Sequence, residues 1–418
     1  MQGGSIYVKF TSPVDWEGVS DEQSYTVSTT TDNITFDDDI DSCSFIPLTT
    51  TDCQVIANIG STVPPADNYS FSITQGAGTD VPVSNSSLIF NVESAVNSVA
   101  YIVDESEPGD VSKCDIVDTG NLEECSNEGV TYGDATTLVN PIGIAIQEIA
   151  GENYAYIVNS TSSNVVKCAI NEQNNLENCT AYDEVLFDGG DLQGVALREV
   201  SNGTNYIYVA NSEEIGDFDD GAIIKCEIGD EGAIDAETCT GIGDGGIDVP
   251  VGIAFREFNG QVFAYITVDA DILKCNTDAG GGIQHECNTS ATDDPIGGEP
   301  KGIVFQLVGA TTYAYVADAG ANVVYKCEAD NVGDLSECVD ALSPEENPFG
   351  DPNWIATEEI NNKIYVYVTD QGDSMADPAI QSAVIKCEVS ESGYLSNCEA
   401  TVNDIESPAG IAIIDLSE

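Results

Sequence analysis

The stretch PKGIVFQLVGATTYAYVADAGANVVYKC, residues 300–327, contains the features that decide the fold of this chain. A short apolar segment after Pro and Gly is followed by a Tyr-rich alternating segment, and then by an apolar segment that ends in Lys-Cys. Short alternating runs bounded by glycine are typical of β-strands and the turns between them. The stretch therefore predicts three consecutive strands.

The same order recurs along the chain. First segments read GIAI (143–146), GVAL (194–197), GIAF (252–255), GIVF (302–305), WIAT (354–357) and GIAI (410–413). Second segments read YIVD, YIVN, YVAN, YITV, YVAD and YVTD. The cysteines of the Lys-Cys segments recur at intervals of 54, 58, 49, 52 and 60 residues. With a fourth strand that carries a second cysteine, each repeat is a four-stranded unit, which is the size of a propeller blade. We expect an all-β chain with a six-bladed β-propeller over residues 96–418.

The ends of the repeat array indicate how the ring closes. The last Lys-Cys unit is followed by PAGIAIIDL, a first segment without a unit after it, while the first unit lacks such a segment before it. Residues 410–416 are therefore expected to complete blade one, and such closure removes exposed sheet edges. SLIFNV, residues 87–92, is the rival for this position because its spacing to YIVD is similar.

All fourteen cysteines fall into local pairs. Facing cysteines on two adjacent antiparallel strands lie near disulfide distance. Zinc binding is the alternative, but the chain has a single histidine, His285, to join the cysteines as a ligand. We expect the disulfides Cys43–Cys53, Cys114–Cys125, Cys168–Cys179, Cys226–Cys239, Cys275–Cys287, Cys327–Cys338 and Cys387–Cys398. Disulfides form in oxidising compartments, so the chain is expected to be secreted and extracellular or at the cell surface.

The repeats resemble the NHL-repeat and related six-bladed propellers over residues 99–416. In that family a Pro-x-Gly-Ile-Ala strand precedes Tyr-Val-Ala-Asp, and an Asn precedes the third strand. The matching residues in two blades are Pro141, Gly143, Ile144, Ala145, Tyr156, Val158, Asn159 and Asn164, and Pro300, Gly302, Ile303, Tyr315, Val316, Asp318 and Asn322. The family's basic residue after the Asn is displaced here to the Lys before Cys, which puts a basic RNA groove in doubt.

Residues 1–95 have a different composition, rich in Ser and Thr, with six or seven short alternating runs. Strands of this length and number indicate a small β-sandwich of immunoglobulin-like type. The first run, GGSIYVKF, could pair within its own sandwich or add to the sheet of a neighbouring subunit.

The net charge of the chain restricts which kinds of partner it can bind. The chain has 73 acidic against 11 basic residues and a formal net charge of −62. Phosphate backbones and anionic lipids would be repelled, so we expect no nucleic acid as a partner, and no apolar run is long enough for membrane insertion. Cations, other protein subunits and cell-surface ligands remain as candidates.

Acidic and amide residues suggest calcium as a cofactor, and no organic cofactor is indicated. Six-bladed lactonases hold a divalent cation at the channel mouth with Asp, Glu and Asn. Asp and Asn also end strands by forming local turns, so a turn role stays open. The candidate ligands at the ends of the second segments are Asp104, Asn159, Asn211, Asp269, Asp318 and Asp370. Further candidates in acidic clusters are Asp37, Asp39, Asp41, Asp217, Asp219 and Asp220.

One lysine precedes the first cysteine of every repeat. In a strand it points away from the cysteine's face and could pair with carboxylates of the neighbouring blade, which is a structural role. A ring that binds an anionic ligand is the alternative. The residues are Lys113, Lys167, Lys225, Lys274, Lys326 and Lys386.

We expect no catalytic triad, because the chain has one histidine and its cysteines are expected to be paired in disulfides. The sequence thus favours a secreted, non-enzymatic protein that acts in cell-surface adhesion, in ligand binding or as a subunit of an extracellular fibre. A metal-dependent hydrolase or lactonase that uses the propeller channel is the alternative.

Overall fold

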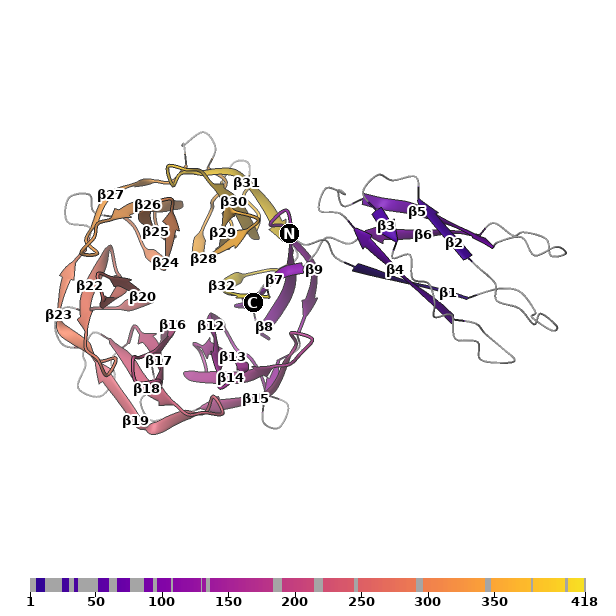
Figure 1. Cartoon of the computed structure of the whole chain (residues 1–418). Coiled ribbons are helices and arrows are strands. Elements are labelled where there is room, and N and C mark those ends of the chain that lie inside the picture. The colour runs from indigo at the N-terminus through magenta and orange to yellow at the C-terminus, as the bar shows by residue number, and fades with distance from the viewer. Residues whose placement is uncertain are drawn as a thin grey trace. The chain divides into compact units, whose positions relative to one another are not determined.

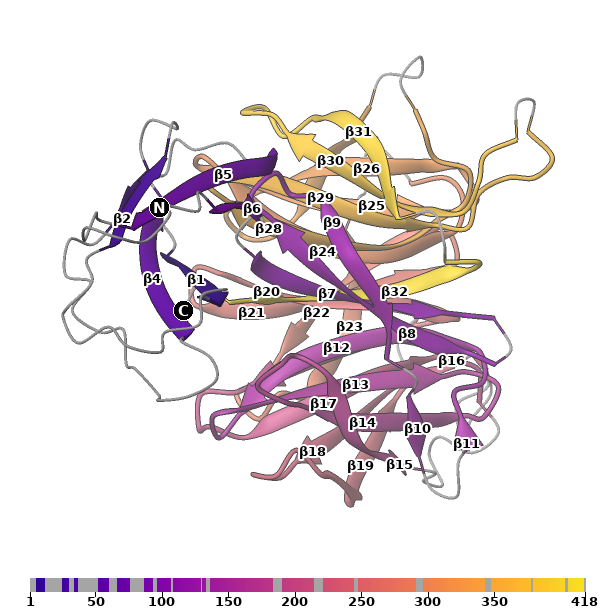
Figure 2. The same ribbon diagram turned by 90° about the vertical axis from the view of Figure 1, so that its right-hand side faces the viewer.

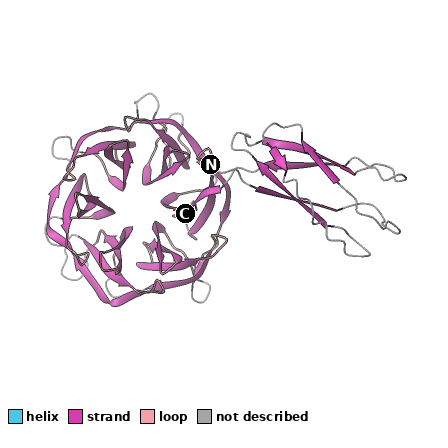
Figure 3. Ribbon diagram, viewed as in Figure 1, coloured by secondary structure: helices cyan, strands magenta, loops and turns pink. Residues whose placement is uncertain are grey.

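The computed structural model of the chain contains two compact units, residues 1–95 and 96–418. In the first unit it describes the backbone of six strands. In the second it describes residues 96–416 except 107, 129, 133–135, 183–189, 214–220, 244–246, 291–295, 343–346, 377–378 and 403–404. Every regular element within these described ranges is a β-strand (Figure 3).

The first unit has two three-stranded antiparallel sheets. One has the order β1 (Ser5–Thr11), β4 (Asp52–Ile59) and β3 (Ile34–Phe36). The other has the order β2 (Tyr25–Thr29), β5 (Ala66–Gln75) and β6 (Ser86–Val92). β1, the segment considered for assembly, pairs with β4 from Ser5 to Thr11. The immunoglobulin-like assignment stays a prediction, and the expected bridge from Cys43 to Cys53 lies outside the described residues.

The second unit is a six-bladed propeller of four-stranded antiparallel sheets. Blade one consists of β32 (Pro408–Asp415), β7 (Val96–Asp104), β8 (Asp110–Val117) and β9 (Leu122–Asn127). Blade two consists of β12 (Pro141–Ile149), β13 (Glu152–Asn159), β14 (Asn164–Ile170) and β15 (Leu176–Tyr182). Blade three consists of β16 (Leu192–Glu199), β17 (Asn205–Asn211), β18 (Ala222–Ile228) and β19 (Ile234–Ile242).

The remaining blades follow in chain order. Blade four consists of β20 (Pro250–Phe258), β21 (Gln261–Val268), β22 (Asp271–Thr277) and β23 (Ile283–Thr289). Blade five consists of β24 (Pro300–Val308), β25 (Thr311–Asp318), β26 (Val323–Ala329) and β27 (Leu335–Asp340). Blade six consists of β28 (Pro352–Ile360), β29 (Lys363–Asp370), β30 (Ala383–Val389) and β31 (Leu395–Val402). A separate small hairpin is formed by β10 (Thr131–Tyr132) and β11 (Thr136–Thr137).

The C-terminal strand closes the ring. β32 pairs antiparallel with β7, from Pro408 opposite Asp104 to Asp415 opposite Ser98. SLIFNV, the rival for this position, belongs to β6 and pairs with β5. The first strand of each blade lies innermost around the axis, and the fourth lies outermost (Figure 1). Figure 2 shows the propeller after a quarter turn, with β32 beside β7, which pairs with β8 on its other edge.

Apolar cores lie between neighbouring blades, one at each of the six junctions. At the closing junction, Ile102 of β7 and Val384 of β30 belong to one buried cluster. Each blade is a twisted sheet with two apolar faces, and stacking a neighbour on each face removes both from water. No helix in the described part of the chain is long and apolar enough to span a membrane.

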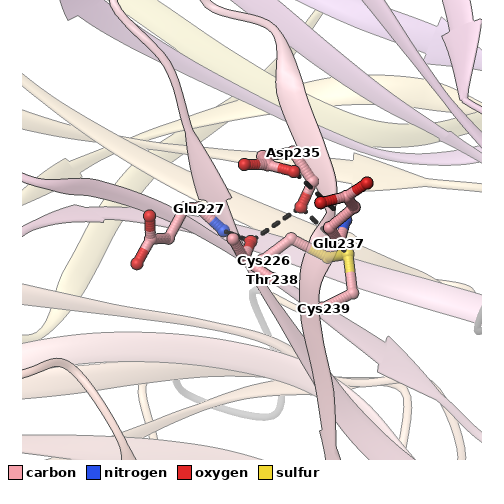
Figure 4. The surroundings of a disulfide bond; sticks show 6 residues. All are labelled: Cys226, Glu227, Asp235, Glu237, Thr238 and Cys239. Atoms are coloured by element: carbon pink, nitrogen blue, oxygen red, sulfur yellow. Dashed lines mark hydrogen bonds between the residues drawn. A yellow bond between two sulfur atoms is a disulfide. The ribbon is translucent and has the colours of Figure 1, made fainter.

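Six local disulfides join the third and fourth strands, one per blade. They are Cys114–Cys125, Cys168–Cys179, Cys226–Cys239, Cys275–Cys287, Cys327–Cys338 and Cys387–Cys398. Each ladder shifts register beside the first cysteine. Zinc ligation, the alternative for the cysteines, does not apply to these twelve sulfurs, because all of them are bonded in pairs. In blade three, Thr238 accepts a hydrogen bond from the Glu227 amide and donates one to the Asp235 carbonyl, which fixes the bulge beside the bridge (Figure 4).

Candidate functional site

The propeller axis holds a polar cavity of about 330 Å³ at one end of the innermost strands. Apart from Trp354, the third residue of β28, its wall is built from three positions that repeat in the blades: the residue just before the first strand, the second residue of that strand, and the residue just after the second strand. The lining residues are Glu105, Asn140, Ile142, Ser160, Asp191, Gln193, Val251, Glu299, Lys301, Ala319, Asp351, Asn353, Trp354, Gln371 and Ala409.

A bulge at the start of each first strand aims these side chains at the axis. The ladder between the first two strands shifts register after the first residue, so the second residue has no partner in it. A bulge re-aims the side chains beside it. In blade six the flanking residues Asp351 and Asn353 both reach the cavity, and in blade three Asp191 and Gln193 do so.

Four carboxylates and one lysine carry the charge of the cavity: Glu105, Asp191, Glu299, Asp351 and Lys301. Burial raises the pKa of Glu105, and the nearby charge of Asp351 adds to this increase. Burial likewise raises the pKa of Asp351, while Lys301 opposes the increase. Lys301 Nζ lies 3.8 Å from Glu299 Oε2. The cavity is thus acidic, with two carboxyl groups that hold their protons more tightly than usual.

Hydroxyl and amide groups fix two of these carboxylates. Ser160 Oγ donates to Asp191 Oδ1 at 2.5 Å, and Ser212 Oγ donates to Asp191 Oδ2 at 3.1 Å. Gln371 Nε2 donates to Glu105 Oε2 at 2.5 Å. Side chains held by such bonds in a cavity are oriented before a ligand arrives.

The six predicted ligands do not line the cavity; five of them end second strands, and Asp269 is the residue after β21. They are Asp104, Asn159, Asn211, Asp269, Asp318 and Asp370. Asp318 Oδ1 accepts from the Glu299 amide at 2.8 Å, and Asp370 Oδ1 accepts from the Asp351 amide at 3.2 Å. Burial raises the pKa of Asp370 to about 6, although three backbone amides oppose the increase. Metal binding by this set stays a prediction. In the structure Asp318 and Asp370 hold the segments that carry the cavity carboxylates.

The sequence reasoning missed the cavity residues by one position. It chose the strand-ending Asp or Asn, whereas the residue after it faces the axis in three blades, as Glu105, Ser160 and Gln371. Side chains alternate direction along an extended chain, so neighbours face opposite ways. The available signal was the residue before each Pro of the first segments, which is Asn140, Glu299 or Asp351 in three blades.

The other predicted metal ligands fall outside the described residues: Asp37, Asp39, Asp41, Asp217, Asp219 and Asp220. Among the side chains that the structure describes, no group of three or more His, Cys, Asp or Glu is already gathered at metal-binding spacing. The cavity does offer carboxylate and amide oxygens, which are the ligands that calcium prefers. The donor chemistry therefore fits a hard cation bound by a mixture of carboxylate and amide groups.

The repeated lysines reach the neighbouring blade, where each Nζ contacts a backbone carbonyl of the outer turn, although Lys113 and Lys386 lie closer to the side-chain oxygens of Asn175 and Asn121. For example, Lys225 Nζ lies 2.6 Å from the Gly280 carbonyl and 3.8 Å from the centroid of the Tyr206 ring. The other five bond in the same way, from Lys113 to Gln173, Lys167 to Glu231, Lys274 to Val332, Lys326 to Ser392 and Lys386 to Thr119. An inter-blade carboxylate partner is found for Lys274, with Asp334 at 2.7 Å. These contacts place the lysines at the blade junctions, and the structural role expected of them stays a prediction.

No family model and no curated protein matches the chain. Solved structures resemble it at low identity. A protein from Lactobacillus plantarum is 15% identical, with a TM-score of 0.49, over 82% of this chain and 95% of that chain. A chain of a nidogen/laminin complex is 12% identical, with a TM-score of 0.49, over 77% and 99%. The periplasmic gluconolactonase of Pseudomonas aeruginosa is 13% identical, with a TM-score of 0.48, over 84% and 96%.

The comparison corrects the expected function. The sequence favours a non-enzymatic protein that acts in cell-surface adhesion, in ligand binding or as a subunit of an extracellular fibre. The similar structures include enzymes, namely the gluconolactonase and a GH43 protein from Bacillus licheniformis. The non-enzymatic interpretation is replaced here by its alternative, a hydrolase or lactonase, which is argued below from the cavity. It equated the lack of a histidine triad with a lack of catalytic groups, whereas positioned carboxyl groups can also transfer protons.

Proposed function

We propose that the axial cavity is the active site of a hydrolase that opens lactones or related esters with the help of a divalent cation, for which calcium is the first candidate. The observation that carries this proposal is the convergence of four carboxylates, one lysine and several amides in one cavity at the propeller axis. Concave sites with a few converging polar groups and perturbed carboxyl pKa values are typical of enzymes.

Two blades supply the residues that would hold the cation. Asp351 with Asn353, and Asp191 with Gln193, offer carboxylate and amide oxygens from facing blades. A bound cation supplies charge that polarises the carbonyl oxygen of the substrate. The cation prefers oxygen ligands of this kind.

Glu105 is our candidate for the general base that takes a proton from the attacking water. Its pKa is raised by burial, which brings a carboxylate closer to the pH at which a base is most effective. The hydrogen bond from Gln371 orients the carboxylate, leaving its other oxygen directed toward Asn140. Lys301 can balance negative charge that develops on the substrate.

We extend the proposal to three finer assignments from the sequence: the location of the protein, the relationship of its propeller to a family, and the fold of its N-terminal unit. Six disulfides are typical of an oxidising compartment, and we place the protein outside the cytoplasm, as a secreted protein. The NHL-like relationship of the propeller rests on the Pro-x-Gly and Tyr-x-x-Asp segments. An immunoglobulin-like sandwich is proposed for residues 1–95.

The experiment is a proton-release assay on a panel of lactones that includes glucono-1,5-lactone and γ-butyrolactone. The full chain is dialysed against EDTA, assayed, and assayed again after addition of CaCl₂ or MnCl₂. We expect hydrolysis that is lost with EDTA and restored by one of the cations. Hydrolysis that survives EDTA would remove the cation from the proposal, and no hydrolysis of any lactone under any condition would refute the proposed reaction.

A further inference from the structure

Trp354 occupies a position at which the other five blades have glycine. The equivalent residues, third in each first strand, are Gly143, Gly194, Gly252, Gly302 and Gly410. The difference is confined to blade six, where WIAT replaces the Gly-Ile-Ala pattern. A large aromatic residue in place of a repeated glycine on the innermost strand changes what fills the axis.

The innermost strands leave almost no room at this level of the ring. A Cβ atom added at Gly143 would lie 2.8 Å from the Gln193 carbonyl of the next blade, and one added at Gly410 would lie 2.9 Å from the Cα of Gly143. Distances below 3.0 Å are closer than real Cβ contacts. The glycines therefore let the backbones of neighbouring first strands approach around the axis.

The indole of Trp354 crosses this narrow level. Its Cη2 atom lies 2.6 Å from the position of a Cβ built on Gly194 in blade three, which faces blade six across the ring. Trp354 also packs against the apolar clusters between blades one and two and between blades six and one. Trp354 also lines the cavity, and it directly follows the lining residue Asn353 in the sequence. The indole therefore lies both in the wall of the cavity and beside the first strand of the facing blade three.

We propose that Trp354 closes the axial channel and forms the aromatic floor of the cavity, so that it determines which ligands bind. The ligand enters from the carboxylate end alone and is limited to a compact molecule by the volume of about 330 Å³. An indole face is electron-rich and attracts C–H groups. The ligand class is a single-ring molecule with one C–H-rich face and polar groups at its edge. The ligand part rests on the proposed function, whereas closure of the channel does not.

Closure is tested by quenching of the Trp354 fluorescence with acrylamide. The chain has two tryptophans, so Trp16→Phe leaves Trp354 as the sole indole. In that background Val251→Phe narrows the cavity above the indole, and Val332→Phe, at a half-exposed outer turn, is the matched control. We expect Val251→Phe to lower the quenching constant to about half, because the quencher can reach the indole from the mouth alone. An unchanged constant would show access from the other end and would overturn the closure.

The role in ligand choice is tested with any lactone that the full chain hydrolyses. Trp354→Gly restores the glycine of the other blades and removes the floor, while Trp354→Phe keeps an aromatic ring. We expect Trp354→Gly to raise KM about tenfold with little change in kcat, and Trp354→Phe to keep KM within about threefold. An unchanged KM in a folded Trp354→Gly variant would overturn the specificity role. If no lactone is hydrolysed, the proposed function fails, and the quenching experiment still decides the closure.

Discussion

The hydroxyl of Tyr367 in blade six donates a hydrogen bond to the carbonyl oxygen of Gly120 in blade one, at 2.7 Å and across 247 residues of sequence. The same contact recurs at the other five junctions, from Tyr101 to Asn174, Tyr156 to Gly232, Tyr208 to Gly281, Tyr265 to Gly333 and Tyr315 to Gly393. Each of these six tyrosines thus holds the outer turn of the next blade. The junction that closes the ring is built like the five that are connected through the chain.

Removal of the closing hydroxyl should cost as much stability as removal of an internal one. Tyr367→Phe deletes a buried hydrogen bond and should lower the free energy of unfolding by about 1–2 kcal/mol. Tyr315→Phe is the matched variant, because its hydroxyl makes the same bond within the array. Denaturant unfolding of both variants checks this, and a Tyr367→Phe variant as stable as the wild type would show that the closing bond does not form.

Alkaline pH should destabilise the propeller. Burial raises the pKa of all six of these tyrosines above the ordinary value of 10.0. The folded state keeps protons that the unfolded state loses above about pH 10, so this stabilisation is complete below that pH and declines above it. Burial lowers the pKa of Lys167, Lys225 and Lys326, which opposes the trend up to about pH 10.5.

Thermal melting as a function of pH measures this effect. The midpoint should fall steeply above about pH 10.5, and tyrosinate absorbance should appear together with unfolding rather than before it. Ionisation of the six tyrosines in a folded propeller would contradict the prediction.

Lys225 should stabilise its blade junction in a manner that added salt barely changes. Its partners are the Gly280 carbonyl and the Tyr206 ring rather than a carboxylate. Lys225→Met keeps the aliphatic stem and should lose about 1–2 kcal/mol of unfolding free energy at both low and high salt. Lys363→Met is the control: its ion pair with Glu388 is exposed, and such pairs contribute little. Equal stabilities for the two variants would argue against the contact.

Each disulfide should stabilise the blade that contains it. Replacing Cys226 and Cys239 by serine opens a short loop between two adjacent strands and should cost about 2–3 kcal/mol. The melting midpoint of the double variant measures the loss. Peptide mapping without reduction tests the pairing itself, because free thiols or a bridge from blade three to another blade would be incompatible with the fold.

The propeller could be predicted from the sequence because its signals are local and repeated. Strand alternation, the paired cysteines and the orphan segment GIAI (410–413) each require only neighbouring residues or comparison between repeats. The strand order β32-β7-β8-β9 agrees with the expectation for the C-terminal segment. The lysines were placed at the blade junction, but their carbonyl and aromatic partners depend on the position of the next blade's turn.

The cavity could be predicted only in part. The sequence indicated the channel end of the second strands, yet the bulge after Pro352 and its equivalents decides which side chains turn toward the axis. That bulge is a property of strand pairing, and the Pro at its start marks its place without showing which side chains it turns toward the axis. Trp354 was read as part of a first strand, and its position across from Gly194 becomes visible only when the ring is closed.

The most direct test of the account is kcat/KM for hydrolysis of glucono-1,5-lactone, in the presence of CaCl₂, by the wild type, Asp351→Asn and Glu257→Gln. Asp351 lines the cavity, and its carboxylate should contribute about 100-fold or more to the rate. Glu257 is exposed near the opposite end of β20 and should be dispensable. The account predicts activity in the wild type and Glu257→Gln and its loss in Asp351→Asn. Equal activity in all three proteins would show that the chemistry does not take place in the axial cavity.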